Sequence, residues 1–308
     1  MRESNWNFAD ELTRHGPNST QNSLDLEQSR QYCTNLACNH YENFPVLTRF
    51  VPADRRQDFA NVYAYCRWSD DIGDEVGDPA KSLELFIWWL SDLERCYSDQ
   101  TPQHPVMIAL KSTIQQFNIP IQPFRNLVAA FQRDQTQTRY RDFSDVMSYC
   151  ECSADPVGRI VLYLCDSFSE ERGRLSDKVC TGLQLANFWQ DVAIDIGKDR
   201  IYLPQDSMVR FGVTESDIVH KKFTPQFAKL LEFEVNRADE LLLEGRALAK
   251  QLKGRWKIVI GLFAEGGRTV LRKIRRNGYN VFDRRPKLSR GDLAGLVART
   301  MLFLMRPK

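Results

Sequence analysis

The chain has 308 residues, of which 43% are hydrophobic and 27% charged, and its net charge is +2. This composition is typical of a globular protein, and so small a net charge gives no indication of nucleic-acid binding. None of the eight cysteines forms a C-x-x-C pair, which argues against a zinc site and favours reduced thiols in the cytoplasm. No apolar run approaches the 18 residues of a membrane span.

The N-terminal residues 1–28 are polar and predict a flexible tail. From there to residue 308 the hydrophobic pattern is helical almost throughout, interrupted by turns that contain proline or glycine. No sustained strand alternation and no long internal repeat is visible. The sequence therefore predicts one all-α domain over 29–308, a helical bundle.

The stretch "CRWSDDIGDE" (66–75) places four carboxylates in six positions. It continues a helix whose apolar spacing over 59–66 marks a buried face. The same spacing predicts that Asp70 and Asp74 point inward, one turn apart. Two further acids lie about 100° around the helix and are ranked lower, as supporting residues: Asp71 and Glu75.

A second acidic helix is predicted within "CTGLQLANFWQDVAIDIGKDRIYLP" (180–204). One side of it is apolar, while another side carries polar groups at successive turns: Gln184, Asn187, Asp191 and Asp195. A single D-x-x-x-D pattern is most often solvated surface, but two such patterns that prolong core stripes indicate a polar cavity. Facing carboxylates there would repel each other unless cations lie between them.

Magnesium fits such a cavity because it binds few protein carboxylates and completes its shell with water and substrate phosphates. The two acidic helices therefore predict Mg²⁺ ions that bridge to a diphosphate. A diphosphate also needs basic partners, and the neighbouring candidates are Arg67, Lys198 and Arg200.

These two stretches resemble the signatures of the squalene and phytoene synthase family, over roughly residues 31–290. The resemblance implies an all-α isoprenoid synthase fold around a central cavity. It also implies two or three Mg²⁺ ions bound with an isoprenoid diphosphate substrate. The metal ligands that it implies are Asp70, Asp74, Asn187, Asp191 and Asp195. The resemblance also implies a catalytic role for the four aspartates.

Other segments match the family as well. "SYCECSADPVGR" (148–159) implies a catalytic role for Tyr149, and "HYENFP" (40–45) and "NGYNVFDRR" (277–285) imply contacts to the substrate. The implied diphosphate-binding residues are His40, Asn43, Arg67, Gln184, Lys198, Arg200 and Arg284. The candidates for an aromatic substrate pocket are Phe44, Tyr63, Phe188 and Tyr202.

Two departures from the common family pattern narrow the expected reaction. The chain has "SADP" at 153–156 where most members read Val-Ala-Gly, and Gly267 where most carry tyrosine. These features resemble the hydroxysqualene synthase branch of bacterial hopanoid biosynthesis. They imply conversion of presqualene diphosphate to hydroxysqualene and diphosphate by ionisation, cation rearrangement and water capture. No G-x-G-x-x-G motif follows a strand, so no nucleotide cofactor is expected.

Three alternatives remain open at this point. The first is head-to-head condensation of two farnesyl diphosphates to presqualene diphosphate or squalene. The second is a class I terpene cyclase, which lacks the matched "HYENFP" and "YC" segments. The third is an inactive family member that serves as a helical scaffold.

The C-terminal stretch "LAGLVARTMLFLMRPK" (293–308) is apolar with basic flanks and is compatible either with a membrane surface or with packing on the domain. The expected location is the cytoplasm, with peripheral contact to the inner face of the membrane. Expected partners are the neighbouring enzymes of the pathway, a presqualene diphosphate synthase and a hydroxysqualene reductase.

Overall fold

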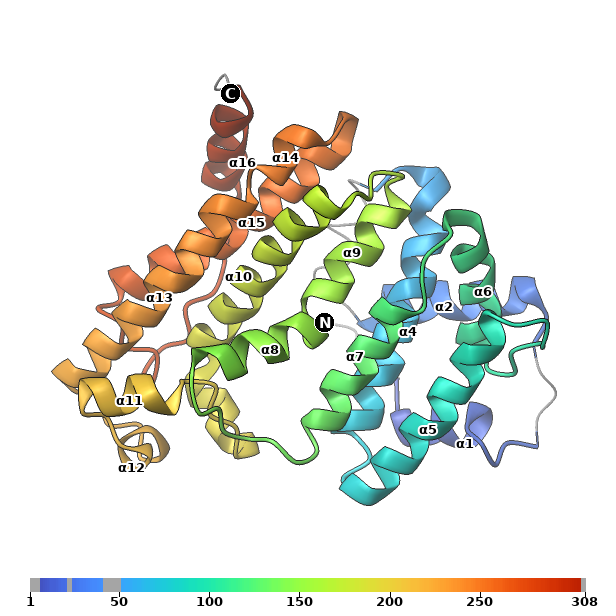
Figure 1. Cartoon of the computed structure of the whole chain (residues 1–308), viewed down its shortest axis with the longest axis horizontal. Helices are drawn as coiled ribbons and strands as arrows, with labels where there is room; N and C mark the ends of the chain where they lie inside the picture. The colour runs from blue at the N-terminus through green and yellow to red at the C-terminus, as the bar shows by residue number, and fades with distance from the viewer. Residues whose placement is uncertain (1–5, 21–23, 41–50, 306–308) are drawn as a thin grey trace. The chain divides into compact units, whose positions relative to one another are not determined.

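The computed structural model describes residues 6–20, 24–40 and 51–305, except for the side chains of three of them: Asn39, His40 and Arg290. These ranges are helical apart from turns and one isolated bridge between Arg139 and Ile201, which confirms the all-α prediction. By their internal contacts the residues form two compact units, whose helices are labelled in Figure 1. Unit 1 is Met1–Thr136 with Tyr163–Asp166, and unit 2 is Gln137–Leu162 with Ser167–Lys308. The sequence predicts a single domain over 29–308, within which this division falls.

Unit 1 is built around one helix, α4, which contacts four others. The helices of this unit are α1 (Phe8–His15), α2 (Leu26–His40), a 3₁₀ turn (Ala53–Arg55), α4 (Arg56–Asp74), α5 (Pro79–Cys96), α6 (Pro105–Phe117) and α7 (Gln122–Arg133).

The buried face of α4 is aromatic. Tyr65 and Trp68 stack on Trp89 of α5, with ring centroids 5.5 and 5.6 Å apart, and the edge of Tyr65 meets Phe124 of α7 at 5.1 Å. These large rings exclude more water than any other side chains of the helix, so they decide which face of α4 turns inward.

The predicted flexible tail is wrong for residues 6–15, which form the start of unit 1. Asn7 caps α1 by accepting hydrogen bonds from the backbone of Ala9 and Asp10. Phe8 is buried and meets Trp68 edge-on at 5.2 Å, and Trp6 donates a hydrogen bond to Asp71 at 3.1 Å. Two aromatic anchors within a polar segment are enough to hold a short helix on the core.

Unit 2 is organised around α10, which contacts α8, α13, α14 and α15. The helices of this unit are α8 (Phe143–Ser153), α9 (Asp155–Leu164, whose last two residues count with unit 1), α10 (Glu170–Asp195), a 3₁₀ turn (Ile196–Lys198), α11 (Gln205–Phe211), α12 (Glu215–Val219), α13 (Pro225–Gly245), α14 (Leu248–Gln251), α15 (Gly254–Arg276) and α16 (Arg290–Met305).

Both ends of α10 follow from local sequence. Ser169 accepts a hydrogen bond from the backbone of Arg172, and Glu170 and Glu171 stand in the first turn, where the helix dipole favours acids. At the other end the helix tightens into the 3₁₀ turn, and Asp199 takes a left-handed conformation with φ of 55°. The chain therefore turns back directly after Asp195.

Within the described ranges, we find no helix that combines the length and the apolarity needed to cross a membrane.

Candidate active site

The C-terminal half of α10 carries two acids one turn apart. Asp191 is 7% exposed, and the guanidinium of Arg285 binds both of its oxygens, with Nη2 2.6 Å from Oδ2. Arg285 comes from the segment between α15 and α16, 94 residues further along the chain. A buried carboxylate at the end of α10 is therefore held by one bidentate cation.

Asp195 is the more unusual acid of this pair. Its Oδ2 is buried and has no hydrogen-bond partner among the described residues. Burial and the charge of Asp191 raise the pKa of Asp195 to about 7, against the opposing influence of Arg200, Lys198 and Arg285. Asp195 is thus a partly buried carboxylate beside a second acid, and one of its oxygens has no hydrogen-bond partner among the described residues. These are properties of a carboxylate that binds a cation.

The other polar residues predicted on this helix lie along the same edge. Gln184 is partly exposed and Asn187 is exposed, so the oxygens of α10 are arranged from solvent at Asn187 to the interior at Asp191. Lys198 is exposed and Arg200 is half-buried, and the positive charges of both oppose the rise in the pKa of Asp195. The structure thus brings together the predicted acids and two of the predicted basic residues of this region.

These groups fit a hard divalent cation. Amide and carboxylate oxygens are the ligands that Mg²⁺ prefers, and the unpartnered Oδ2 of Asp195 lies beside the acid Asp191. Within the described part of the chain, no group of three or more histidine, cysteine, aspartate or glutamate side chains is close enough to hold a metal ion by itself. The fit therefore depends on the pair Asp191 and Asp195.

Four buried aromatic side chains form a cluster beside this helix: Tyr140, Tyr149, Phe188 and Tyr202. Phe188 and Tyr202 stack with ring centroids 3.6 Å apart and an interplanar angle of 6°. Tyr149 lies 6.0 Å from Phe188 and 5.8 Å from Tyr202. We call this group the aromatic cluster. It unites three residues that the sequence predicts near the reaction centre.

Tyr140 is the member of the aromatic cluster that the sequence does not predict. It stacks on Tyr202 at 5.4 Å and meets Tyr149 edge-on at 5.7 Å. Backbone hydrogen bonds bring it there: Ile201 donates to the carbonyl of Thr138, and Gln205 donates to the carbonyl of Tyr140. Such pairing between segments 60 residues apart leaves no local sequence signal.

The first acidic motif, at the end of α4, is oriented differently from the prediction. Asp71 is fully buried, the side chain of Asp70 is 42% exposed, and Asp74 is exposed. The aromatic face with Tyr65 and Trp68 turns into the core, and Asp71 lies beside it. Asp70 and Asp74 instead continue a neighbouring, half-buried stripe.

Asp71 has structural partners. The guanidinium of Arg67 binds both of its oxygens, with Nε 3.0 Å from Oδ2, and Trp6 donates to the same Oδ2. Burial raises the pKa of Asp71, and Arg67 and Trp6 oppose this shift. Arg67 also lies 3.4 Å from Asp70. The predicted diphosphate contact Arg67 is thus engaged with two acids of its own helix.

The remaining predicted residues of unit 1 are placed as follows. Tyr63 is half-buried and packs against Ala37 and Ala60. Glu75 is exposed and follows the last residue of α4. The side chain of His40, and the whole of Asn43 and Phe44, lie outside the described residues.

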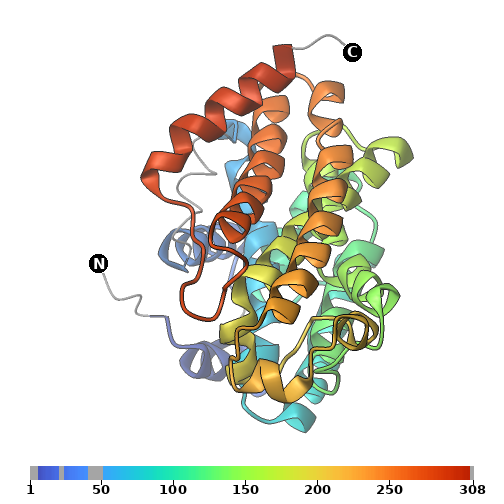
Figure 2. The same ribbon diagram turned by 90° about the vertical axis from the view of Figure 1, so that its left-hand side faces the viewer.

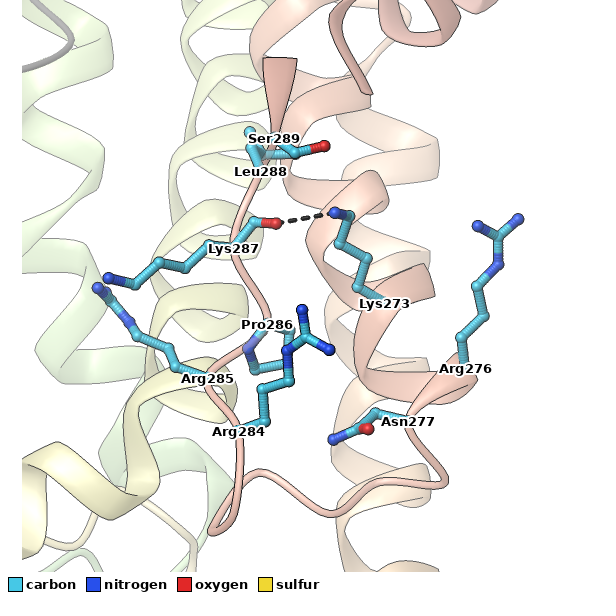
Figure 3. Close-up of a pocket in the computed structure, with 9 residues that line it drawn as sticks. All are labelled: Lys273, Arg276, Asn277, Arg284, Arg285, Pro286, Lys287, Leu288 and Ser289. Atoms are coloured by element: carbon cyan, nitrogen blue, oxygen red, sulfur yellow. Dashed lines mark hydrogen bonds between the residues drawn. The ribbon is translucent and has the colours of Figure 1, made fainter. Parts of the chain in front are cut away.

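The basic residue at Asp191 is Arg285. Its neighbour Arg284 is the residue that the sequence predicts as a contact to the diphosphate, and that role stays a prediction. Arg284 is exposed and lines a cavity of about 580 Å³ together with Arg285, Lys273, Arg276 and Lys287 (Figure 3). The side chains of Arg284 and Arg285 point to different sides of this segment (Figure 3), and only Arg285 reaches the acid. The sequence locates the basic pair but does not say which member binds.

Gly267, the second departure from the family pattern, is buried in α15. A Cβ atom here would lie 2.8 Å from Leu183 and 2.9 Å from Leu242, whereas a Cβ at Gly266 would meet only Leu296 at 3.7 Å. We expect Gly267→Ala to destabilise the protein by about 1–2 kcal/mol because overpacking outweighs the helix propensity of alanine.

Gly266→Ala is the matched control for this prediction, on the same helix. It should raise the free energy of unfolding by up to about 1 kcal/mol, since alanine is the better helix former and the space is open. Urea unfolding of both variants measures the difference. If Gly267→Ala is as stable as Gly266→Ala, the leucines do not confine position 267.

Comparison with known proteins identifies the family of this chain. The family model for squalene/phytoene synthase matches residues 37–292. A phytoene synthase of Arthrospira platensis is 28% identical over 272 residues, which cover 83% of this chain and 87% of the relative. The solved structure of squalene synthase HpnC from Alicyclobacillus acidocaldarius is 39% identical, with a TM-score of 0.79, over 83% of this chain and 96% of that chain.

A dehydrosqualene synthase solved with a ligand shares the fold, with a TM-score of 0.81 at 24% identity over 91% of this chain and 97% of that chain. The family match spans both acidic helices and the whole basic segment between α15 and α16. The acids of α10 and the aromatic cluster lie within the matched residues. The chain belongs to the squalene/phytoene synthase family.

Proposed function

We propose that this protein converts presqualene diphosphate to hydroxysqualene and diphosphate. The C–O bond to the diphosphate breaks, and its electron pair leaves with the diphosphate. The resulting cyclopropylcarbinyl cation rearranges with ring opening. Water then adds through its oxygen to the rearranged cation and loses a proton to solvent.

The observation that carries this proposal is the likeness to squalene synthase HpnC, at 39% identity and with nearly the whole of that chain covered. The two sequence departures at 153–156 and at Gly267 favour the same branch of the family. Gly267 is also fixed by its packing, because even a methyl group there would approach two leucines closely.

The acids would hold Mg²⁺, and their basic neighbours would bind the diphosphate. Each acidic helix contributes its own ligands, Asp70 and Asp74 from α4 and Asn187, Asp191 and Asp195 from α10. Two or three Mg²⁺ ions bound by these oxygens would act as Lewis acids that neutralise the departing diphosphate. Arg285 binds Asp191 through a bidentate contact, and a guanidinium in this place would also suit the oxygens of a diphosphate. Lys198 and Arg200 add positive charge beside Asp195.

The aromatic cluster would protect the cation. Its rings present negative faces that stabilise positive charge, and its burial keeps bulk water away until rearrangement is complete. Tyr149 meets three rings of this cluster and carries a hydroxyl, which makes it the candidate to orient the terminating water. Tyr140 adds a fourth ring to the cluster by stacking on Tyr202.

Head-to-head condensation of two prenyl diphosphates is the second candidate. The phytoene synthase of Arthrospira platensis, 28% identical over 83% of this chain, favours it. Both reactions use the same acids, so the acids alone do not separate them.

Incubation of the purified protein with Mg²⁺ and one substrate at a time separates the two candidates. With presqualene diphosphate we expect hydroxysqualene in the lipid extract by mass spectrometry, in the absence of NADPH. With farnesyl diphosphate or geranylgeranyl diphosphate we expect no condensation product. A protein that consumes farnesyl diphosphate and ignores presqualene diphosphate would contradict the proposal.

The proposed reaction implies two neighbouring activities, a synthase that supplies presqualene diphosphate and a reductase that consumes hydroxysqualene. We place the protein in the cytoplasm, where these partners and the reduced cysteines would be found together.

A further inference from the structure

The C-terminal helix α16 exposes an apolar face. Its exposed positions follow helical spacing, and every one from residue 293 onward is apolar: Leu293, Ala294, Val297, Ala298, Met301, Leu302 and Met305. Leu302 is 57% exposed and Met305 is 72% exposed. A continuous apolar stripe on the outside of a helix is unusual for a surface that faces only water.

The side of α16 that faces α15 carries the polar residues. Asp292 forms an ion pair with Lys273 at 2.6 Å, Arg299 lies 3.6 Å from buried Glu265, and Thr300 is fully buried. Phe303 and Leu304 also turn inward and pack on the core. The two charged side chains Asp292 and Arg299 thus have their partners on α15, and Thr300 is buried, so the exposed stripe itself carries no polar side chain.

Basic residues border this helix. α16 runs antiparallel to α15 along its outer side (Figure 2), and the groove between the two helices is lined by Arg272, Arg276 and Arg299. From residue 272 to 299 the sequence has nine basic and two acidic residues, a net charge of +7 in a chain of net charge +2. The 580 Å³ basic cavity lies at the start of α16 and includes Lys287 and Leu288 (Figure 3).

An apolar stripe with a basic border matches an anionic lipid surface. The apolar side chains would enter the boundary of the acyl chains, while the arginines and lysines would meet the phosphates of the headgroups. A second copy of the chain fits less well, because symmetric pairing of this face would bring together the exposed basic residues of two copies, Arg276, Arg284 and Lys287. We propose that α16 docks this protein in the plane of a membrane that contains anionic lipid.

Vesicle flotation of the full-length protein tests this proposal. We expect the protein to float with phosphatidylcholine vesicles that contain phosphatidylglycerol, and to float less with phosphatidylcholine alone or in high salt. Val297→Gln combined with Met301→Gln should lower partitioning at least about tenfold. Arg276→Gln should lower binding to the anionic vesicles about fivefold.

The matched control is Val209→Gln on α11, where an apolar side chain is 80% exposed outside the stripe. It should float like the unmodified protein. Thermal unfolding and turnover with detergent-dispersed substrate should be unchanged in the double variant, so a failure of docking is distinguishable from a failure of the proposed reaction.

Flotation that is absent, that does not depend on anionic lipid, or that the double variant retains would overturn the docking. A stable dimer that the double variant dissociates, together with no flotation, would assign the stripe to a second copy instead. Sedimentation equilibrium on the same samples detects that outcome.

Discussion

Asp191→Asn should lower kcat/KM by at least about 100-fold, because it removes one charge from the pair that would bind Mg²⁺ and also frees Arg285. The side chain keeps its size, so the substitution tests charge rather than packing. Diphosphate release from the prenyl substrate, followed over a range of Mg²⁺ concentrations, measures the effect. A ligand role predicts that added Mg²⁺ restores part of the activity.

Asp177→Asn is the control on the same helix. Asp177 pairs with Arg159 at 2.8 Å, away from the acid pair, and its loss should leave kcat/KM within about twofold. Circular dichroism melting of both variants checks that they fold. Turnover that survives Asp191→Asn unchanged would remove Asp191 from the catalytic site and would contradict metal-dependent catalysis by this residue.

Asp71→Asn should lower the free energy of unfolding by about 2 kcal/mol, because it leaves Arg67 without its bidentate partner beside the core. The cost is smaller than for a fully buried pair, since the side chain of Arg67 keeps 26% exposure and Asp70 lies within reach. Urea unfolding monitored by tryptophan fluorescence measures the change.

Asp70→Asn is the matched variant one position away. Its side chain is 42% exposed, so stability should change by less than about 0.5 kcal/mol. Its turnover should fall sharply if Asp70 is a metal ligand. The two variants therefore separate an acid that holds the fold from an acid that serves the reaction. Equal losses of stability in both would contradict this division of roles.

The orientation of α4 shows where sequence periodicity reaches its limit. Two adjacent stripes of this helix are apolar, one through Phe59, Tyr63 and Cys66 and one through Tyr65 and Trp68. The pattern alone does not rank them. The stacking of Tyr65 and Trp68 on Trp89 does, and it turns Asp71 rather than Asp70 inward.

The helix α10 was more fully predictable. Its acids, amides and aromatic residues come from one continuous segment, so 3.6-residue spacing already places Asp191 and Asp195 one turn apart. The sequence also identifies the basic residues that follow, because Lys198 and Arg200 lie within one turn of the helix end. The structure adds the burial that raises the pKa of Asp195.

The sequence by itself determined the all-α class, the family and the two acidic helices, because these depend on residue types at local spacing. Only the tertiary structure decided that Arg285 rather than Arg284 binds Asp191, that Tyr140 joins the aromatic cluster, and that α16 turns its apolar face outward. Each of these depends on contacts between segments distant along the chain. Such contacts are selected by packing and charge in three dimensions, which no local pattern encodes.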